Sequence, residues 1–497
     1  MSDSIEHVFV LMLENRSFDH FFAYSGIPGL QGVNTSMTNP GKTAGSVVPM
    51  SDTTPDRLWS DPGHEFEDVD WQMYHAPRVA GPRPVTMQGF ADKDWPEAMA
   101  CAKPALIPVL AHLAHEFLVC DQWFSPMPGP TWPNRFFVHA ASSGGLANSP
   151  SNPALIKAMT RRKLGFSFEH GTIYQALENA GCTWRIYHGD LFPQVCAINT
   201  MPSVFVASPD RFRSNKDLAG DISGGDVANY TFIEPDYGIL TNFWTSDCQH
   251  PPGKISAGEQ LVHDVAAAVM GNPAVWEKSM LVIVYDEHGG FYDQWHPPDC
   301  VPPGDAPLNI DKTKHPPNPN PAFDFRRFGP RVPAVVVSPW VLPGSVSHTT
   351  YDHASIIRSV FELFGLPGNL TARDAAGTSN SLLPFLKGPL RTETPAALPD
   401  ANDLDSIPPP PAQPGAPAPP SLHGFARIAA QIDHALNNYR SGMQPEELEA
   451  AVGTLDTVPN LPDLPTTDDP DEARDYIRKV GERVEVHRRR QLAGQSP

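Results

Sequence analysis

Ionisable side chains follow two apolar segments of the chain at the point where each segment ends. The segment VFVLML is followed by Glu14 and Asn15, and the segment LVIVY by Asp286 and Glu287. Apolar runs of this length suit strands that are buried on both faces of a parallel sheet. Ligands of open parallel sheets bind beyond the carboxyl ends of the strands, so we expect these four side chains to meet in one cleft.

Three carboxylates in one cleft repel one another strongly unless a cation lies between them. A divalent ion removes that repulsion, and the oxygen ligands favour a hard ion, Ca²⁺ first, with Mg²⁺, Mn²⁺ or Zn²⁺ as alternatives. Each acid could instead cap a helix or pair with an arginine in a loop. That explanation suits one isolated acid better than two acid-bearing pairs, so the sequence favours one divalent metal ion here.

A hydroxyl group that could attack an ester lies in the segment PMPGPTWPNRFF. Thr131 precedes a predicted helix, and Pro133 falls in its first turn, where proline is favoured. Threonine at such a place commonly caps backbone N–H groups. It also has a reactive use, because a helix N-terminus attracts anions and a neighbouring metal favours the alkoxide needed for attack on phosphorus. Arg135 could bind a phosphoryl oxygen or form a salt bridge.

Histidines add groups that can donate or accept protons. His64 lies in SDPGHEFED, His250 in SDCQHPP and His353 in YDHASIIR, and His288 directly follows the second acidic pair. The usual pKa of histidine lets it donate a hydrogen bond or a proton to the leaving oxygen of an ester. Each of them could also be a structural or capping residue, and His288 a ligand, a supporting group or a core residue.

The elements that must position these residues alternate along residues 1 to about 395. The segments HVFVLML, MLVIVY and VPAVVVSPW are predicted as buried parallel strands, and TWRIYH as a further strand. The segments GTIYQALENAG and SAGEQLVHDVAAAVMGN are predicted as helices that close at Gly181 and Gly271. This alternation favours an α/β sandwich around a mostly parallel sheet.

A proline-rich segment, IPPPPAQPGAPAPPS, divides the chain and is typical of an extended polyproline II spacer. We predict a catalytic domain at residues 1–395, a linker at 396–421 and a small helical region at 422–497. In the last of these, GFARIAAQIDHALNNY and PDEARDYIRKVGERVEVHRRRQL have the apolar spacing of amphipathic helices. Every residue with predicted chemistry precedes the linker.

Composition limits the partners. The 497 residues include 36 basic and 56 acidic ones, a net charge of −20, which argues against nucleic acid and against electrostatic docking to anionic membranes. No apolar run is long enough for a transmembrane helix, so we expect a soluble protein with at most transient contact with a membrane surface. It would be secreted or periplasmic if a leader has been removed, and cytoplasmic otherwise. The six cysteines could be thiols or up to three disulfides.

Five short segments occur in one order over the first 360 residues. They are ENRSFDH (14–20), TWPNR (131–135), QHPP (249–252), DEHGGFYD (286–293) and YDHASIIR (351–358). Together they resemble the phosphoesterase family that includes phosphatidylcholine-hydrolysing and non-specific phospholipases C and a class of acid phosphatases. The resemblance implies an alkaline phosphatase-like three-layer α/β sandwich.

The resemblance also implies roles for individual residues. Thr131 corresponds to the nucleophile, and His64 and His250 correspond to histidines that line the phosphate site. The metal ligands that it implies are Glu14, Asn15, Asp286 and Glu287. The residues that we predict to bind substrate are Asn134, Arg135, His288 and His353.

Threonine rather than serine at position 131 points to the phospholipase branch of the family. Two departures from the family's pattern, Gln294 and Ala354, stand outside the implied metal and nucleophile positions and could alter substrate preference.

The sequence therefore predicts a metal-dependent phospholipase C that cleaves phosphatidylcholine-type lipids through a phosphoryl-threonine intermediate. Two alternatives remain open at this point. One is an acid phosphatase-type phosphomonoesterase that acts on small soluble substrates. The other is a binding or scaffolding protein that has kept the fold and lost catalysis.

Overall fold

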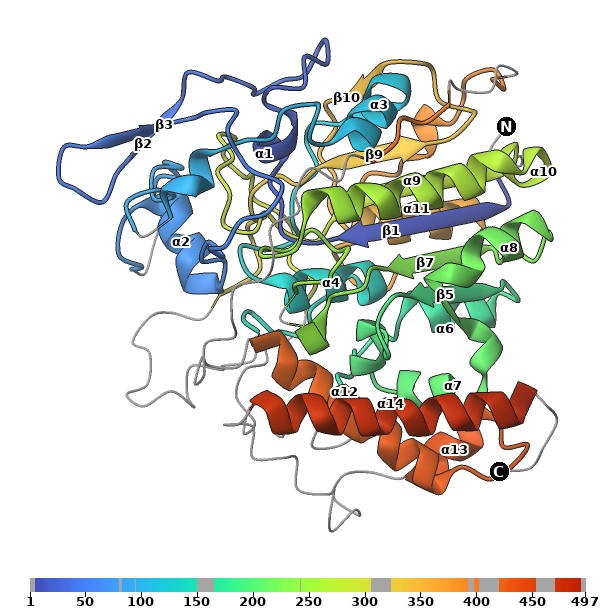
Figure 1. Ribbon diagram of the computed structural model, residues 1–497. Coiled ribbons are helices and arrows are strands. Elements are labelled where there is room, and N and C mark those ends of the chain that lie inside the picture. Colours follow the sequence, from blue (N-terminus) through green and yellow to red (C-terminus); the bar gives the residue numbers. More distant parts are fainter. Residues whose placement is uncertain are drawn as a thin grey trace.

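A mostly parallel sheet runs through the centre of the molecule (Figure 1). The computed structural model describes residues 5–79, 83–93, 95–149, 165–241, 243–304, 323–391, 397–401, 420–452 and 470–492. Within these ranges the sheet has eight strands in the order β10-β4-β9-β8-β1-β7-β5-β6, and a separate pair, β2 and β3, projects from the side.

The strands are β1 (His7–Leu13), β2 (Thr38–Pro40), β3 (Val47–Pro49), β4 (Leu118–Cys120), β5 (Trp184–His188), β6 (Phe212–Ser214), β7 (Tyr230–Glu234), β8 (Ser279–Tyr285), β9 (Ala334–Val337) and β10 (Ser345–Ser347). The α-helices are α1 (Phe18–Phe22), α2 (Phe66–Tyr74), α3 (Pro108–Glu116), α4 (Thr131–Ala140), α6 (Ile173–Asn179), α7 (Met201–Ala207), α8 (Leu218–Ser223), α9 (Ile255–Gly271), α10 (Pro273–Trp276), α11 (Ala354–Leu363), α12 (Pro420–Asn438), α13 (Pro445–Val452) and α14 (Pro470–Leu492).

The central strands β1 and β8 pair in parallel along their whole length, from His7 opposite Ser279 to Leu13 opposite Tyr285. Both strands are almost entirely buried, as their β-branched and aliphatic sequences predict. The strand predicted in VPAVVVSPW also forms, but its predicted direction was wrong. It is β9, and it pairs antiparallel with β8 and with β4. An apolar run shows that a strand is buried but carries no information about its direction.

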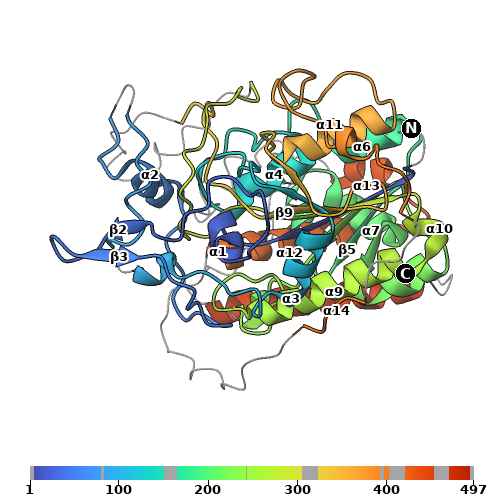
Figure 2. The ribbon, with the colours of Figure 1, turned by 90° about the horizontal axis from the view of Figure 1, so that it is seen from above.

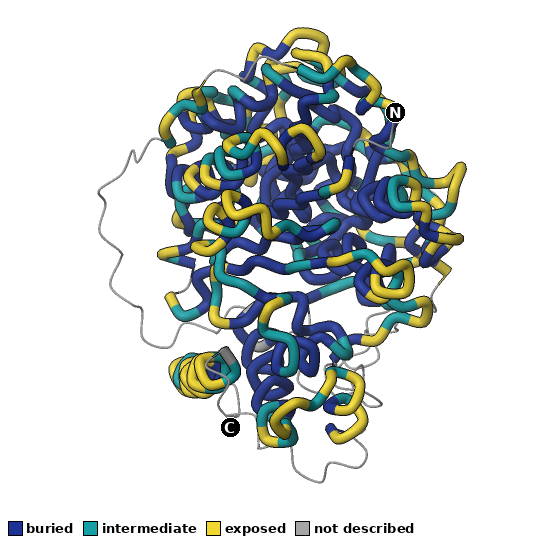
Figure 3. Tube along the Cα trace, turned by 90° about the vertical axis from the view of Figure 1, so that its right-hand side faces the viewer, coloured by how far each residue is buried: buried dark blue, intermediate teal, exposed yellow. Residues whose placement is uncertain are grey.

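Helices cover both faces of this sheet. Figure 2 shows α3 and α9 on one side, and α4, α6 and α11 on the other. The buried residues gather around the central strands, and the exposed ones lie at the periphery (Figure 3). The predicted three-layer α/β sandwich with a mostly parallel central sheet is therefore confirmed. The predicted helices at 171–181 and 256–272 are α6 and α9, each within two residues of its predicted limits.

The C-terminal helices pack against the sandwich beside α7 (Figure 1). Apolar residues of α12 and α14 belong to the same buried cluster as the central strands. Residues 402–419, which contain most of the predicted linker, lie outside the described residues, so the predicted domain limits stay a prediction.

All six cysteines are free thiols, which decides between the two states that the sequence allowed. None of the described helices has the length and apolar character needed to cross a lipid bilayer.

A buried ion network ties the segment after β1 to the segments that follow β8. The guanidinium of Arg331 donates to Asp293 Oδ1 at 3.0 Å and to Asp19 Oδ1 at 3.0 Å. It also donates to three backbone carbonyl oxygens, among them that of Asp121 at 3.0 Å. Arg331 and both carboxylates have no exposed surface. Burial and the neighbouring Asp293 raise the pKa of Asp19 to about 7 despite the arginine.

Removal of this arginine should destabilise the whole fold. In Arg331→Met two buried carboxylates lose their counter-charge, and we expect the free energy of unfolding to fall by about 3–5 kcal/mol in urea titrations. The matched control is Arg326→Met, because Arg326 is 68% exposed and its ion pair with Asp324 spans 3.9 Å. We expect a loss below about 1 kcal/mol for that variant. Equal losses in the two variants would contradict a structural role for the network.

Candidate active site

The ends of β1 and β8 bring the two predicted acidic pairs together. Since Leu13 lies opposite Tyr285 in adjacent parallel strands, Glu14 and Asn15 leave the sheet beside Asp286 and Glu287. The backbone N–H of Asn15 donates to Asp286 Oδ1 at 3.1 Å. Two segments 271 residues apart in the sequence therefore form one group of side chains at the carboxyl edge of the sheet.

The backbone around this group is tightly packed. Asn15 has a φ of 59°, in the left-handed region, and Gly289 has a φ of 65°. A Cβ atom on Gly289 would lie 2.1 Å from the carbonyl oxygen of Asn15, so only glycine allows this approach. The N–H of Gly289 also donates to Glu287 Oε2 at 2.7 Å and so orients that carboxylate.

The three carboxylates are buried and repel one another. Burial, with the charge of Asp286, raises the pKa of Glu14 to about 8. Burial raises the pKa values of Asp286 and Glu287 to about 7 each, although Arg135 and His64 act in the opposite direction. Within the described residues, Asp286 Oδ2 and Glu287 Oε1 have no hydrogen-bond partner. Buried carboxylate oxygens without donors are the ligands that a hard divalent cation requires, so these residues fit such an ion.

Thr131 is the first residue of α4 and faces this group. Its Oγ1 donates to Asn15 Oδ1 at 3.2 Å. The N-cap position belongs to Pro130, whose ring has no polar atom that could cap the helix. The hydroxyl is thus directed at the ends of the strands, and the capping role that the sequence also allowed is not seen.

The loop before Thr131 is held by Asn134. The amide nitrogen of Asn134 donates to the carbonyl oxygens of Gly129 at 2.8 Å and Pro130 at 3.0 Å. Its amide oxygen accepts from the N–H of Met127 at 3.0 Å. Both ends of the side chain are therefore used within the chain, and Asn134 fixes the turn that presents the hydroxyl.

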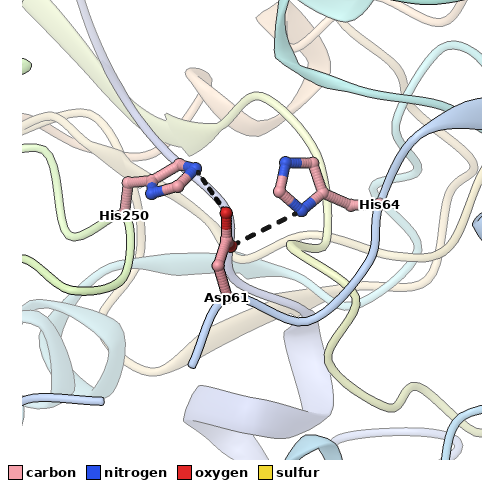
Figure 4. A group of neighbouring side chains, drawn as sticks. All are labelled: Asp61, His64 and His250. Carbon is pink, nitrogen blue, oxygen red and sulfur yellow. Dashed lines mark ion pairs between the residues drawn. The ribbon is translucent and has the colours of Figure 1, made fainter. Parts of the chain in front are cut away.

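A second polar group, Asp61, His64 and His250, adjoins the first (Figure 4). The carboxylate of Asp61 lies between the two imidazole rings, 3.7 Å from His64 Nδ1 and 3.7 Å from His250 Nε2. His64 Nε2 lies 3.2 Å from the amide nitrogen of Asn15, which joins the two groups into one site. One atom from each of the three side chains lies within 4.8 Å of the others, a spacing that could also hold a metal ion.

The two imidazoles have different electrostatic surroundings. Burial disfavours a charge on His64, but Asp61 and Glu287 outweigh that effect and raise its pKa to about 10. Burial lowers the pKa of His250 despite the same aspartate. His250 also stacks on Phe243 with 4.3 Å between ring centroids.

Arg135, predicted to bind substrate, lies behind the strand-end group. It has no exposed surface, and its guanidinium lies 3.7 Å from Asp286 Oδ2 and over the ring of Tyr237. Within the described residues, neither Arg135 nor Asn134 borders the cavity that opens in front of the site. Their contacts support a positioning role, and direct contact with substrate stays an untested prediction.

The two other predicted substrate-binding residues are also buried. His353 Nδ1 accepts from Trp123 Nε1 at 3.2 Å, so its Nε2 donates to the carbonyl oxygen of Asp286 at 2.8 Å. Burial lowers the pKa of this imidazole to about 3. His288 Nε2 lies 2.8 Å from the amide oxygen of Gln72, which links the turn after β8 to α2. Both histidines hold the acidic turn from behind.

A cavity of about 200 Å³ opens in front of the two groups. One side is polar and the other is apolar and aromatic. The polar side includes Glu14, Asp61, His64, Thr131 and His250. The apolar side includes Trp132, Tyr237, Ile239, Phe243 and Phe425.

Asp61 and the apolar lining residues were not among the site residues predicted from the sequence. Asp61 lies three residues before His64 in a Pro- and Gly-containing loop, and that acid–histidine spacing was a usable signal. Phe425 belongs to α12, beyond the proline-rich segment, and nothing in its local sequence distinguishes it from any other apolar residue of an amphipathic helix.

Several known proteins are similar in sequence to this chain. The sequence profile of the phosphoesterase family matches residues 5–367. Non-specific phospholipase C5 of Arabidopsis thaliana is 33% identical over 410 residues, which cover 76% of this chain and 74% of that one. Phospholipase C B of Mycobacterium tuberculosis (strain CDC 1551 / Oshkosh) is 28% identical over 459 residues, which cover 81% of this chain and 82% of that one.

Among solved structures, the chain is similar to a phosphonate monoester hydrolase of Agrobacterium radiobacter. The TM-score is 0.34 at 11% identity, and the match covers 77% of this chain and 78% of that chain. A protein of the alkaline phosphatase superfamily from Vibrio parahaemolyticus gives a TM-score of 0.29 at 12% identity and covers 69% of this chain and 73% of that one.

The close contact between Gly289 and Asn15 leads to a prediction about stability. In Gly289→Ala the new methyl group meets backbone at 2.1 Å and the residue is forced to keep a positive φ. We expect the free energy of unfolding to fall by about 3 kcal/mol or more, as measured by urea denaturation.

Gly26→Ala is the matched control. Gly26 has a φ of 70°, but its Cβ would meet no atom within 4 Å. We expect a loss of about 1 kcal/mol from the backbone conformation alone. If the two variants lost the same stability, the turn after β8 would not depend on its contact with Asn15.

Proposed function

Since the chain belongs to the phosphoesterase family and is a phosphoric ester hydrolase, we propose that it acts as a phospholipase C on phosphatidylcholine-type lipids. The products would be diacylglycerol and a phosphorylated headgroup. The observation that carries the proposal is the Thr131 hydroxyl, 3.2 Å from Asn15 Oδ1 at the edge of a buried carboxylate group. The names of the relatives, non-specific phospholipases C, support a phosphodiester substrate.

In the proposed first step, Thr131 Oγ1 attacks phosphorus in line with the bond to diacylglycerol. The Oγ1–P bond forms, the bond from phosphorus to the glycerol oxygen breaks, and the hydroxyl proton of Thr131 passes to water in the cavity. The N-terminus of α4 favours the negative charge on the non-bridging oxygens. A phosphoryl-threonine that carries the headgroup alcohol remains, and water hydrolyses it in the second step.

The departing glycerol oxygen needs a proton. His64 and His250 both border the cavity, on either side of Asp61, and we assign this proton transfer to one of them. The carboxylate between them keeps the two rings oriented toward the same space. Asn134 has no part in the chemistry in this proposal, but it keeps the turn before Thr131 in place.

The proposed metal ligands are Glu14, Asn15, Asp286 and Glu287, and Ca²⁺ is the ion that their oxygen atoms favour. When bound, a divalent cation supplies positive charge that offsets the carboxylates and favours ionisation of a nearby hydroxyl. The orphaned oxygens of Asp286 and Glu287 are the observation that supports this assignment. His353 and Gly289 keep these two residues in position from behind.

Replacement of the nucleophile tests the proposal directly. In Thr131→Ala no oxygen is available to attack phosphorus, and we expect turnover of p-nitrophenyl phosphorylcholine and of phosphatidylcholine to fall by about 10³-fold or more. Thr131→Ser keeps the hydroxyl and should retain measurable activity. Acid-quenched wild-type enzyme should yield a phosphorylated peptide that contains residue 131. Wild-type rates in Thr131→Ala would remove the nucleophile assignment.

The same assay separates the proposed activity from the alternative of an acid phosphatase-type phosphomonoesterase. A phospholipase C hydrolyses p-nitrophenyl phosphorylcholine, a diester, at a higher kcat/KM than p-nitrophenyl phosphate, a monoester. The opposite ranking, with no release of diacylglycerol from phosphatidylcholine, would favour the phosphatase.

Removal of divalent metal should lower stability as well as activity. Chelator leaves the three buried carboxylates without a cation, and we expect the thermal unfolding midpoint of the wild type to fall by about 5 °C or more. Added Ca²⁺ should restore it. The Asp286→Asn, Glu287→Gln double variant lacks two of the repelling charges, so chelator should leave its midpoint unchanged. If chelator did not change the thermal unfolding midpoint of the wild type, the proposed ligand set would be contradicted.

A further inference from the structure

The apolar side of the cavity is built in part by the C-terminal helix α12. Phe425 of this helix borders the cavity and is 4% exposed. Its ring lies 6.0 Å from that of Trp132 and 5.6 Å from that of Tyr237, measured between centroids. Trp132 directly follows the proposed nucleophile, so this aromatic group of three, Trp132, Tyr237 and Phe425, lies beside the reacting position.

The backbone of α12 also approaches this group closely. A Cβ atom on Gly424 would lie 2.2 Å from the indole of Trp132. Glycine inside a helix usually costs about 1 kcal/mol relative to alanine, because it gives the unfolded chain more freedom. Here it allows the helix to lie against the indole, which indicates that the contact between α12 and the cavity wall is a specific one.

The rest of the C-terminal region keeps α12 in place. Leu422, Ala429 and Ile432 are fully buried along the same helix. The helix packs against α7 and α14, and Asp433 of α12 forms an ion pair with Arg483 of α14. The wall is therefore anchored over the length of the helix.

The part of this wall that α12 supplies lies outside the segment that defines the family. The family profile ends at residue 367, whereas α12 begins at Pro420. The groups assigned to chemistry, on the polar side of the cavity, all fall within the profile. The cavity thus combines a polar side from the family segment with an apolar side that a later part of the chain completes.

The chemistry of this apolar side favours hydrocarbon over a cationic headgroup. Aromatic rings can bind a quaternary ammonium group through their faces. However, the guanidinium of Arg135 already lies over the ring of Tyr237, 5.1 Å from its centroid. A second cation at that ring would meet a like charge, whereas a methylene chain would not.

We propose that Phe425 is a specificity-determining residue, which binds the hydrocarbon part of the glyceride leaving group at the apolar side of the cavity. The C-terminal helical region would then select acyl-bearing phosphodiesters over short or soluble ones. This inference rests on the proposed phospholipase C activity and names the part of the chain that recognises the leaving group.

The test compares dibutyroyl and dihexanoyl phosphatidylcholine at concentrations at which both are monomeric. Because each methylene in an apolar pocket strengthens binding, wild-type kcat/KM should be higher for the dihexanoyl ester. Phe425→Ala should reduce the ratio of kcat/KM for the dihexanoyl ester to kcat/KM for the dibutyroyl ester by about fivefold or more. Phe425→Trp, which adds bulk to the wall, should lower kcat/KM for the longer ester more than for the shorter one.

Ile432→Ala is the matched control, because Ile432 is buried in the same helix and does not border the cavity. It should lose stability without changing the ratio. An unchanged ratio in both Phe425 variants would overturn the inference. A change confined to the preference for choline over ethanolamine headgroups would also overturn it. If Phe425→Ala does not fold, the result for Phe425→Trp decides alone. Wild-type enzyme that hydrolyses neither ester would instead refute the proposed function.

Discussion

The mutual repulsion of Glu14, Asp286 and Glu287 is the constraint on which the site depends. Burial raises the pKa of each carboxyl, and the guanidinium of Arg135 beside them cannot offset three charges. The sheet nevertheless holds them together, because β1 and β8 pair in parallel and end at the same level. A slip of one residue in this pairing would turn every side chain of the shifted strand to the opposite face. The core therefore fixes an arrangement that is unfavourable by itself and that the proposed cation would stabilise.

Several buried residues support this arrangement through hydrogen bonds and do not border the cavity. His353 holds the carbonyl of Asp286, Gly289 holds the carboxylate of Glu287, and Asn134 closes the turn before Thr131. Their hydrogen-bonding groups are used inside the chain, so they restrict the motion of loops that would otherwise move at the edge of a sheet. The proposed nucleophile, Thr131, would have to stay within a fraction of an ångström of its productive position, and support of this kind restricts its movement.

The sequence predicted the parts of the molecule that depend on local pattern. The strands that precede Glu14 and Asp286, the helix that begins at Thr131 and the C-terminal helices all have a local apolar period or a terminating residue. Direction and contact between distant parts have no such signal. For that reason β9 was expected to be parallel, and the buried positions of Arg135 and His288 could not be distinguished from exposed ones. A charged or polar residue beside a motif has the same appearance in the sequence whether it touches substrate or supports a neighbour.

The C-terminal helix shows why such long-range contacts matter for function. Gly424 packs closely against the indole of Trp132, and Trp132 follows Thr131 in the first turn of α4. The wall of the cavity and the helix that presents the hydroxyl are therefore one packed unit, although they come from segments almost 300 residues apart. A bulkier residue at position 424 would move the indole and, through the shared turn, the hydroxyl.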